Sequence, residues 1–160
     1  MAVNAGTIKA AVKNLITKNN TVTSSYYVSD GLEQTVQFIS GASSVKKPVM
    51  TFEYPAVFVE LKSSLDDWTS LGNTARRNTD INIDVVCVVD WGITQENARE
   101  ESDDELILLT ENIKDLFRNH ITISSTADSC LVTDINYEAE YAEDTYNSQS
   151  RMNLLIKKRG

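Results

Sequence analysis

The clearest pattern in this chain is the change from alternating to continuous apolar positions along Asn78–Asp90. In the first half, Ile81 and Ile83 alternate with polar residues, which predicts a β-strand with one face toward a core. In Val85–Val89 every position is apolar, so both faces of that end are expected to be covered, within the chain or in an interface. This pattern indicates a protein that shares its sheet surface with neighbours, and it favours a structural role over an enzymatic one.

Two segments have the spacing of amphipathic helices. In Thr7–Lys18, apolar residues recur every three to four positions and form one stripe. Ser102–Glu105 has the sequence of a capping box and directly precedes a second stripe, Leu106–Phe117, which predicts a helix that begins at the box. Glu96–Glu101 is either a backward extension of this helix or an acidic loop that leads into it.

The first of two expected hairpins joins Ala56–Leu61 to Asn78–Asp90. The polar composition of the segment between these strands, Lys62–Thr79, predicts a connecting loop of about 17 residues, a length that is usually functional. The loop contains Trp68 and Leu71. We expect these side chains to pack on the domain itself or on a neighbouring subunit.

The second expected hairpin joins Leu131–Tyr141 to Arg151–Lys157. Leu131–Tyr141 alternates strictly, which places Leu131 and Ile135 on one face and acidic residues on the other. The whole chain, residues 1–160, is read as a single domain of the α+β class. Two helices cover one face of a mainly antiparallel sheet of about four strands. Residues 20–54, between the first helix and the first hairpin, form a β-rich excursion with short strands near Tyr26–Val28 and Val36–Ile39.

The chain is acidic, with a formal net charge of −8 and a pI near 4.6. Nucleic-acid binding needs clustered Lys and Arg, so this charge argues against a protein that grips DNA. It is compatible with a channel through which DNA passes without adhering. We expect no signal peptide and no membrane span, hence a cytosolic setting in which Cys87 and Cys130 are buried free thiols.

The sequence gives only weak signals for a catalytic or metal-binding site. His120, Ser124 and Asp128 share one short polar segment that has neither a nucleophile elbow nor an oxyanion-hole signature. Asp80 and Asp84 share a strand face and could approach a cation. A solvated strand edge explains the two carboxylates better than a cation site does. The six glycines form no phosphate-binding loop. We therefore expect no enzymatic activity, no cofactor and no metal.

Four landmarks resemble the tail terminator (tail completion) proteins of tailed bacteriophages, which are related in fold to head–tail joining proteins. The resemblance covers Ala2–Asn19 and Pro55–Lys158. The landmarks are the short apolar helix Thr7–Lys18, the strand Pro55–Leu61 with the later Arg76-Arg77-Asn78-Thr79 entry into an Ile/Val-rich strand, the helix end Ile113-Lys114-Asp115-Leu116-Phe117, and the closing segment Arg151-Met152-Asn153-Leu154-Leu155-Ile156.

The resemblance implies a virion protein that forms a homohexameric ring at the head-proximal end of the tail tube. Such a ring ends tube polymerisation and docks the head connector, or neck, protein, while DNA passes through its lumen without specific binding. The protein would reside in the host cytoplasm during assembly and at the head–tail junction afterwards. As subunit or tube contacts we expect Trp68, Leu71, Arg76, Arg77, Val86 and Val88, with residues 20–54 as a further contact segment; as acidic lumen-facing or tube-facing residues we expect Asp66, Asp67, Glu138 and Glu140.

Other interpretations of the sequence remain open. A head-completion or neck protein one layer higher would follow the same ring logic, and a tube-associated or sheath-associated subunit would polymerise into long stacks instead. A small non-viral cytosolic interaction domain would be monomeric or dimeric. An enzyme would need chemistry contributed across a subunit boundary.

Overall fold

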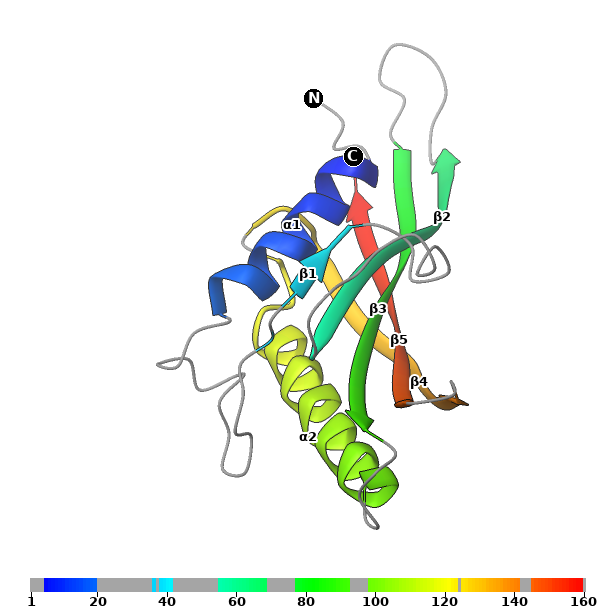
Figure 1. The fold of residues 1–160 in the computed structure, drawn as a ribbon. Helices are drawn as coiled ribbons and strands as arrows, with labels where there is room; N and C mark the ends of the chain where they lie inside the picture. Colours follow the sequence, from blue (N-terminus) through cyan, green and yellow to red (C-terminus); the bar gives the residue numbers. More distant parts are fainter. Residues whose placement is uncertain are drawn as a thin grey trace.

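The computed structural model describes residues 5–19, 36, 38–41, 55–68, 77–92, 98–123, 125–141 and 145–159. Figure 1 shows a twisted sheet with two helices packed on one side of it. The elements are, in chain order, α1 (Ala5–Asn19), β1 (Phe38–Ser40), β2 (Ala56–Trp68), β3 (Arg77–Gly92), α2 (Ala98–Asn119), β4 (Ser129–Tyr141) and β5 (Thr145–Arg159).

The described strands form one sheet in the order β1-β2-β3-β5-β4. The two expected hairpins are present and lie side by side, because β3 pairs with β5 from Asn78 to Gly92. The expectation of about four strands is corrected to five, and the sheet is mixed because β1 runs parallel to β2. Strand β1 has only three residues, Phe38–Ser40, too few for alternation to reveal. It lies in the expected β-rich excursion and partly overlaps Val36–Ile39; Tyr26–Val28 lies outside the described residues.

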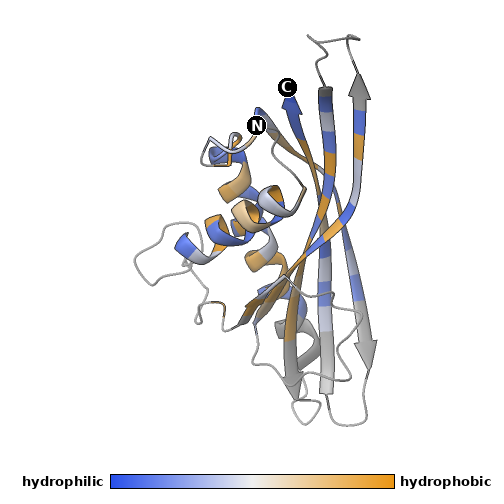
Figure 2. Cartoon of the chain, turned by 90° about the horizontal axis from the view of Figure 1, so that it is seen from above, coloured by the Kyte–Doolittle hydropathy of each residue, from blue (hydrophilic) through white to orange (hydrophobic). Residues whose placement is uncertain are grey.

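The main core lies between the sheet and both helices (Figure 2). Helix α1 lies over β1 and β2, and α2 lies over β3, β5 and β4. The alternation of β3 is confirmed: Ile81, Ile83 and Val85 are fully buried on this helix-covered face. The core also contains Ile8, Val12, Ile16, Val57, Val59, Cys87, Leu109, Ile113, Leu116, Phe117, Met152, Leu154 and Ile156.

We call the other side of the sheet the open face, because no described helix covers it. At one end, Ala56, Phe58, Val86 and Val88 form a separate buried cluster on this face. The expectation that Val85–Val89 is dry on both sides is thus confirmed, and the burial is achieved within a single chain.

Helix α2 begins at Ala98, so the expected start at the Ser102–Glu105 box is wrong and the backward extension is correct. Asp103 does not act as part of a box at a helix end, because it lies in the second turn of the helix. Its Oδ1 instead accepts a hydrogen bond from Ser148 Oγ at 2.7 Å, which ties α2 to β5.

The segment expected to be a long loop, Lys62–Thr79, is mostly strand. β2 continues to Trp68 and β3 begins at Arg77, with these two residues opposite each other in the register. The side chains of Leu61–Asp66 are all exposed, so this half of β2 lacks the buried apolar residues that reveal a strand in a sequence. Its backbone is stabilised by pairing with β3, across a register shift between Leu61 and Ser63.

The strict alternation expected of β4 is also corrected. The register against β5 shifts between Val132 and Asp134, so two residues of β4 there oppose one of β5. Leu131, opposite Leu155, therefore lies on the open face and is 53% exposed, whereas Ile135 packs against the core. An inserted residue flips the face of every later side chain, and periodicity alone does not show where it occurs.

Candidate interaction surface

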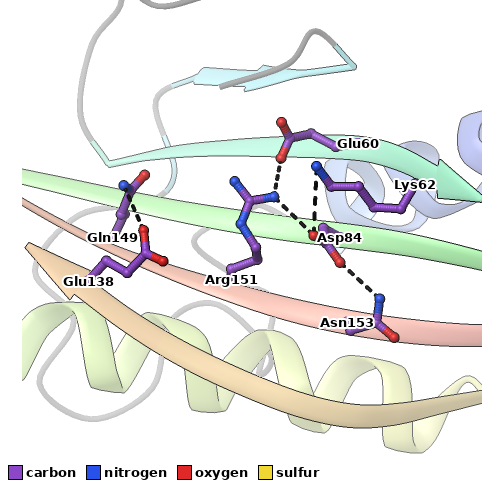
Figure 3. A network of polar contacts seen from close by, with 7 residues as sticks. All are labelled: Glu60, Lys62, Asp84, Glu138, Gln149, Arg151 and Asn153. Carbon is purple, nitrogen blue, oxygen red and sulfur yellow. Dashed lines mark hydrogen bonds and ion pairs between the residues drawn. The ribbon is translucent and has the colours of Figure 1, made fainter. Parts of the chain in front are cut away.

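A polar network spans three strands of the open face (Figure 3). Arg151 of β5 lies at its centre. Its Nη1 donates hydrogen bonds to Glu60 Oε2 of β2 at 2.7 Å and to Asp84 Oδ2 of β3 at 2.9 Å. Asn153 Nδ2 donates to the other oxygen of Asp84, Oδ1, at 2.9 Å. Side chains from distant parts of the sequence thus hold one another in fixed positions.

The two carboxylates of this network are buried, with Glu60 4% and Asp84 6% exposed. Buried charges need partners, and Arg151 supplies the positive charge that both share. Partial burial of Arg151 lowers its pKa, but the hydrogen bonds and charges of Asp84 and Glu60 outweigh that effect, and the pKa of Arg151 ends above its ordinary value. Arg151 is therefore charged at neutral pH.

A shallow pocket of about 400 Å³ opens beside the network. Small-molecule sites are mostly apolar with a few polar groups, whereas every residue that lines this pocket is polar. The walls carry two carboxylates and one guanidinium, which suits contact with the surface of another macromolecule. The lining residues are Asp84, Thr133, Asp134, Asn136, Arg151 and Asn153.

The expected acidic residues do not form one cluster. Asp66 lies on the helix-covered side near the end of β2, where its Oδ1 accepts a hydrogen bond from Thr79 Oγ1 at 2.8 Å. Glu138 lies on the open face of β4, and Gln149 Nε2 donates to it at 3.4 Å. In the register Asp67 is opposite Asn78 and Glu140 is opposite Asn147. The lumen or tube contact of all four stays a prediction.

Among the expected contact residues, Val86 and Val88 are fully buried in the cluster with Phe58. Both side chains point to the open face but have no exposed area, so in this conformation they are not available to a neighbouring subunit. Trp68 and Arg77 end β2 and begin β3. Leu71 and Arg76 lie outside the described residues. Whether these residues contact another subunit stays a prediction.

Cys87 and Cys130 are buried free thiols, as expected. Burial raises the pKa of Cys87 to about 12, an effect that hydrogen bonds with Ser150 and Thr110 only partly offset. Burial likewise raises the pKa of Cys130 to about 12. A thiol with so high a pKa is protonated at neutral pH and is a poor nucleophile or metal ligand.

Sequence reasoning missed Glu60 and Arg151. Glu60 lies within the apolar run Ala56–Leu61, and a carboxylate in such a run signals a buried ion pair. Nothing in the sequence indicates that the partner is 91 positions away. The network depends on the β2-β3-β5 strand order, which only the structure reveals.

Comparison with known proteins adds no family assignment. No protein-family model matches this sequence, and a search among curated proteins finds no significant match. Among the described residues, neither helix is long and apolar enough to cross a membrane.

Proposed function

We propose that this chain is a structural virion protein that forms a hexameric ring at the head-proximal end of a phage tail tube. The ring ends tube polymerisation and provides the docking surface for the head connector. The observation that supports this most directly is the open face, where Arg151 binds two buried carboxylates and the neighbouring side chains Asp134, Asn136 and Glu138 of β4 are exposed. The sequence landmarks of tail terminator proteins supply the position in the particle.

A ring subunit needs two different contact surfaces, because each copy meets the next head to tail. Rigid surfaces lower the entropic cost of such contacts. The long paired strands β3 and β5 and the network of Glu60, Asp84 and Arg151 provide a rigid surface of this kind. A ring made in this way is a platform on which the tube ends and the connector docks.

The charge of the chain also suits a channel for DNA. Six copies at −8 each carry about −48. A like-charged lumen repels phosphates and so prevents DNA from adhering during passage. Glu138 and Asp134 on the open face are exposed contributors to this charge.

Purified protein added to the cognate tail tube subunits tests the proposal. We expect it to bind one tube end, to stop elongation at substoichiometric amounts, and to lie at the neck when labelled in intact particles. Electron microscopy of tube lengths with and without the protein measures the effect. A matched control is the same protein after heat denaturation.

Three results would contradict the terminator assignment. Tubes of unchanged length would show that the protein does not cap them. Binding to the connector without binding to the tube would indicate the head-completion role. Stacks of the protein alone that continue to grow would indicate a tube-like or sheath-like subunit.

A further inference from the structure

The two outer edges of the sheet differ in what lies beside them. On the outer side of β2, β1 pairs only with Ala56–Phe58. Beyond that point, the six residues Leu61–Asp66 are exposed on both faces of the strand. At the opposite border, β4 pairs with β5 on its inner side, and no other described strand lies outside it. Backbone groups along such edges are ready to pair with a further strand.

The directions of these edges match. β2 is antiparallel to β3, β3 to β5, and β5 to β4, so β2 and β4 run in opposite directions. A rotation about an axis along the strands leaves strand direction unchanged. A neighbouring copy placed by that rotation therefore presents its β2 antiparallel to β4, and the pattern of the sheet continues.

Both edges carry exposed apolar side chains, and the β2 segment also carries one cation, Lys62, and one anion, Asp66. On β2, Leu65 is 67% and Leu61 41% exposed; on β4, Leu131 is 53% and Tyr137 48% exposed. Lys62, 42% exposed, lies on the open face within 4.0 Å of Asp84. Across the sheet Asp84 is opposite Asn153, which is opposite Asp134 of β4. A cation at one edge and an anion at the other thus lie at one level of the sheet.

We propose that copies of this chain join head to tail through these edges, with the Leu61–Asp66 half of β2 pairing antiparallel with β4 of the next copy. The sheets then continue from subunit to subunit, with the helices on one side of the ring wall and the open face on the other. This inference deepens the proposed function and rests on it for the closure into a ring.

Charge argues against the symmetric alternative. A two-fold pairing of β4 with β4 would bring together two strands whose charged residues are all acidic: Asp134, Glu138 and Glu140. Like charges on opposing strands are destabilising. Pairing with β2 instead places Lys62 near this acidic edge.

Cysteine cross-linking distinguishes the two arrangements. Ser63→Cys and Thr133→Cys introduce thiols at exposed positions on β2 and β4, and a flexible bismaleimide links thiols of adjacent copies without requiring one register. We expect each single variant to remain uncross-linked and a mixture of the two to give dimers. The double variant should give a ladder that ends at the closed ring. The unmodified protein is the control, because Cys87 and Cys130 are buried.

Dimers from Thr133→Cys alone would overturn the proposal in favour of the symmetric contact. Absence of cross-links from the double variant, both in solution and on capped tubes, would overturn it as well. A charge exchange gives a second readout: Lys62→Glu and Asp134→Lys should each weaken assembly, and together they should restore it. Circular dichroism confirms that every variant is folded.

Failure of this contact and failure of the proposed function give different results. Tubes that are capped by a protein without the β2–β4 cross-link would retain the function and reject the contact. A cross-linked ring that leaves tube growth unchanged would retain the contact and reject the terminator role.

Discussion

Arg151 compensates two buried carboxylates at once, Glu60 and Asp84. Arg151→Leu would leave both negative charges without this partner, and removing one member of a buried ion pair costs about 3–5 kcal/mol. Because the Arg151 side chain is 27% exposed, we expect a loss at the lower end, about 3 kcal/mol. Urea denaturation followed by circular dichroism measures the free energy of unfolding.

The matched control is Arg118→Leu. Arg118 lies 4.0 Å from Asp115 with both side chains well exposed, and surface pairs of this kind contribute about 0–1 kcal/mol. Equal losses for the two variants would show that the network on the open face is no more important for stability than an ordinary surface pair.

Ser125 has a positive φ of 66° in the turn between α2 and β4, and its side chain is exposed. The left-handed conformation costs a non-glycine residue roughly 1–2 kcal/mol. A glycine avoids this cost, but it loses more conformational entropy on folding, and that loss cancels part of the gain in stability. We expect Ser125→Gly to raise the free energy of unfolding by about 0.5 kcal/mol. Thermal denaturation compares it with Ser125→Ala, which retains the strain and should bring no such gain.

Because its thiols are buried, the protein is expected to lose stability at alkaline pH. The pKa of Cys87 is about 12 in the folded chain against an ordinary value of 9.0, so between these values the unfolded chain has lost the proton and the folded chain has not. Stability is therefore lost as pH rises above 9, by about 1.4 kcal/mol per pH unit for each such thiol. Below pH 8 the thiol is protonated in both states and contributes no pH dependence.

Urea titrations at pH 8 to 11 measure this effect by comparing the natural sequence with Cys87→Ala. The lysines titrate in both proteins, so their contribution cancels in the difference. We expect the free energy of unfolding to fall less steeply for Cys87→Ala. Parallel slopes would show that the thiol ionises while buried.

At the scale of elements, β2 combines two environments in one strand. Ala56–Phe58 is buried between β1 and β3, whereas Leu61–Asp66 is exposed and pairs with β3 alone among the described strands. Local opening needs less free energy where few apolar contacts are lost. We expect amide hydrogen exchange in the isolated protomer to be at least about tenfold faster in the exposed half, which corresponds to roughly 1.4 kcal/mol.

Ring assembly should remove part of this difference, if the exposed half of β2 pairs with the next copy. Measuring exchange by mass spectrometry at low and high protein concentration tests this. Uniform protection along β2 in dilute protein would contradict the contrast between its two halves.

The sequence predicts elements where one face is apolar and fails where none is. The stripes of α1 and α2 and the alternation of β3 give these elements correctly, because burial on one side selects the side chains. Leu61–Asp66 has no buried face, so periodicity does not reveal that this part of β2 is a strand. The bulge near Thr133 is defined by how β4 pairs with β5, and the partners of Arg151 are defined by the order of the strands in the sheet. Neither is a property of a local window of sequence.

At the scale of the whole molecule, the proposed ring requires that the charge of a face that lines the channel repels DNA. Glu138 is exposed on the open face. We expect Glu138→Arg to change the free energy of unfolding by less than about 0.5 kcal/mol, as surface substitutions usually do. In the particle it should slow DNA ejection, because each added cation can contact a phosphate.

Ejection followed with a DNA-binding dye measures this rate, and Glu138→Gln separates loss of a negative charge from gain of a positive one. An unchanged ejection rate with both variants would place Glu138 away from the path of DNA. Unfolding of the isolated protomer would instead show that its carboxylate is needed for the fold.

The exposed half of β2 also has a consequence for handling the protein. A two-sided strand with Leu61 and Leu65 in the open is a template for any extended polypeptide, including misfolded copies of the same chain. Mutual repulsion between acidic molecules is the main protection in solution, and it vanishes near the isoelectric point of about 4.6. Mild acid should therefore drive purified material into β-rich precipitate, and solubility should be best well above that pH.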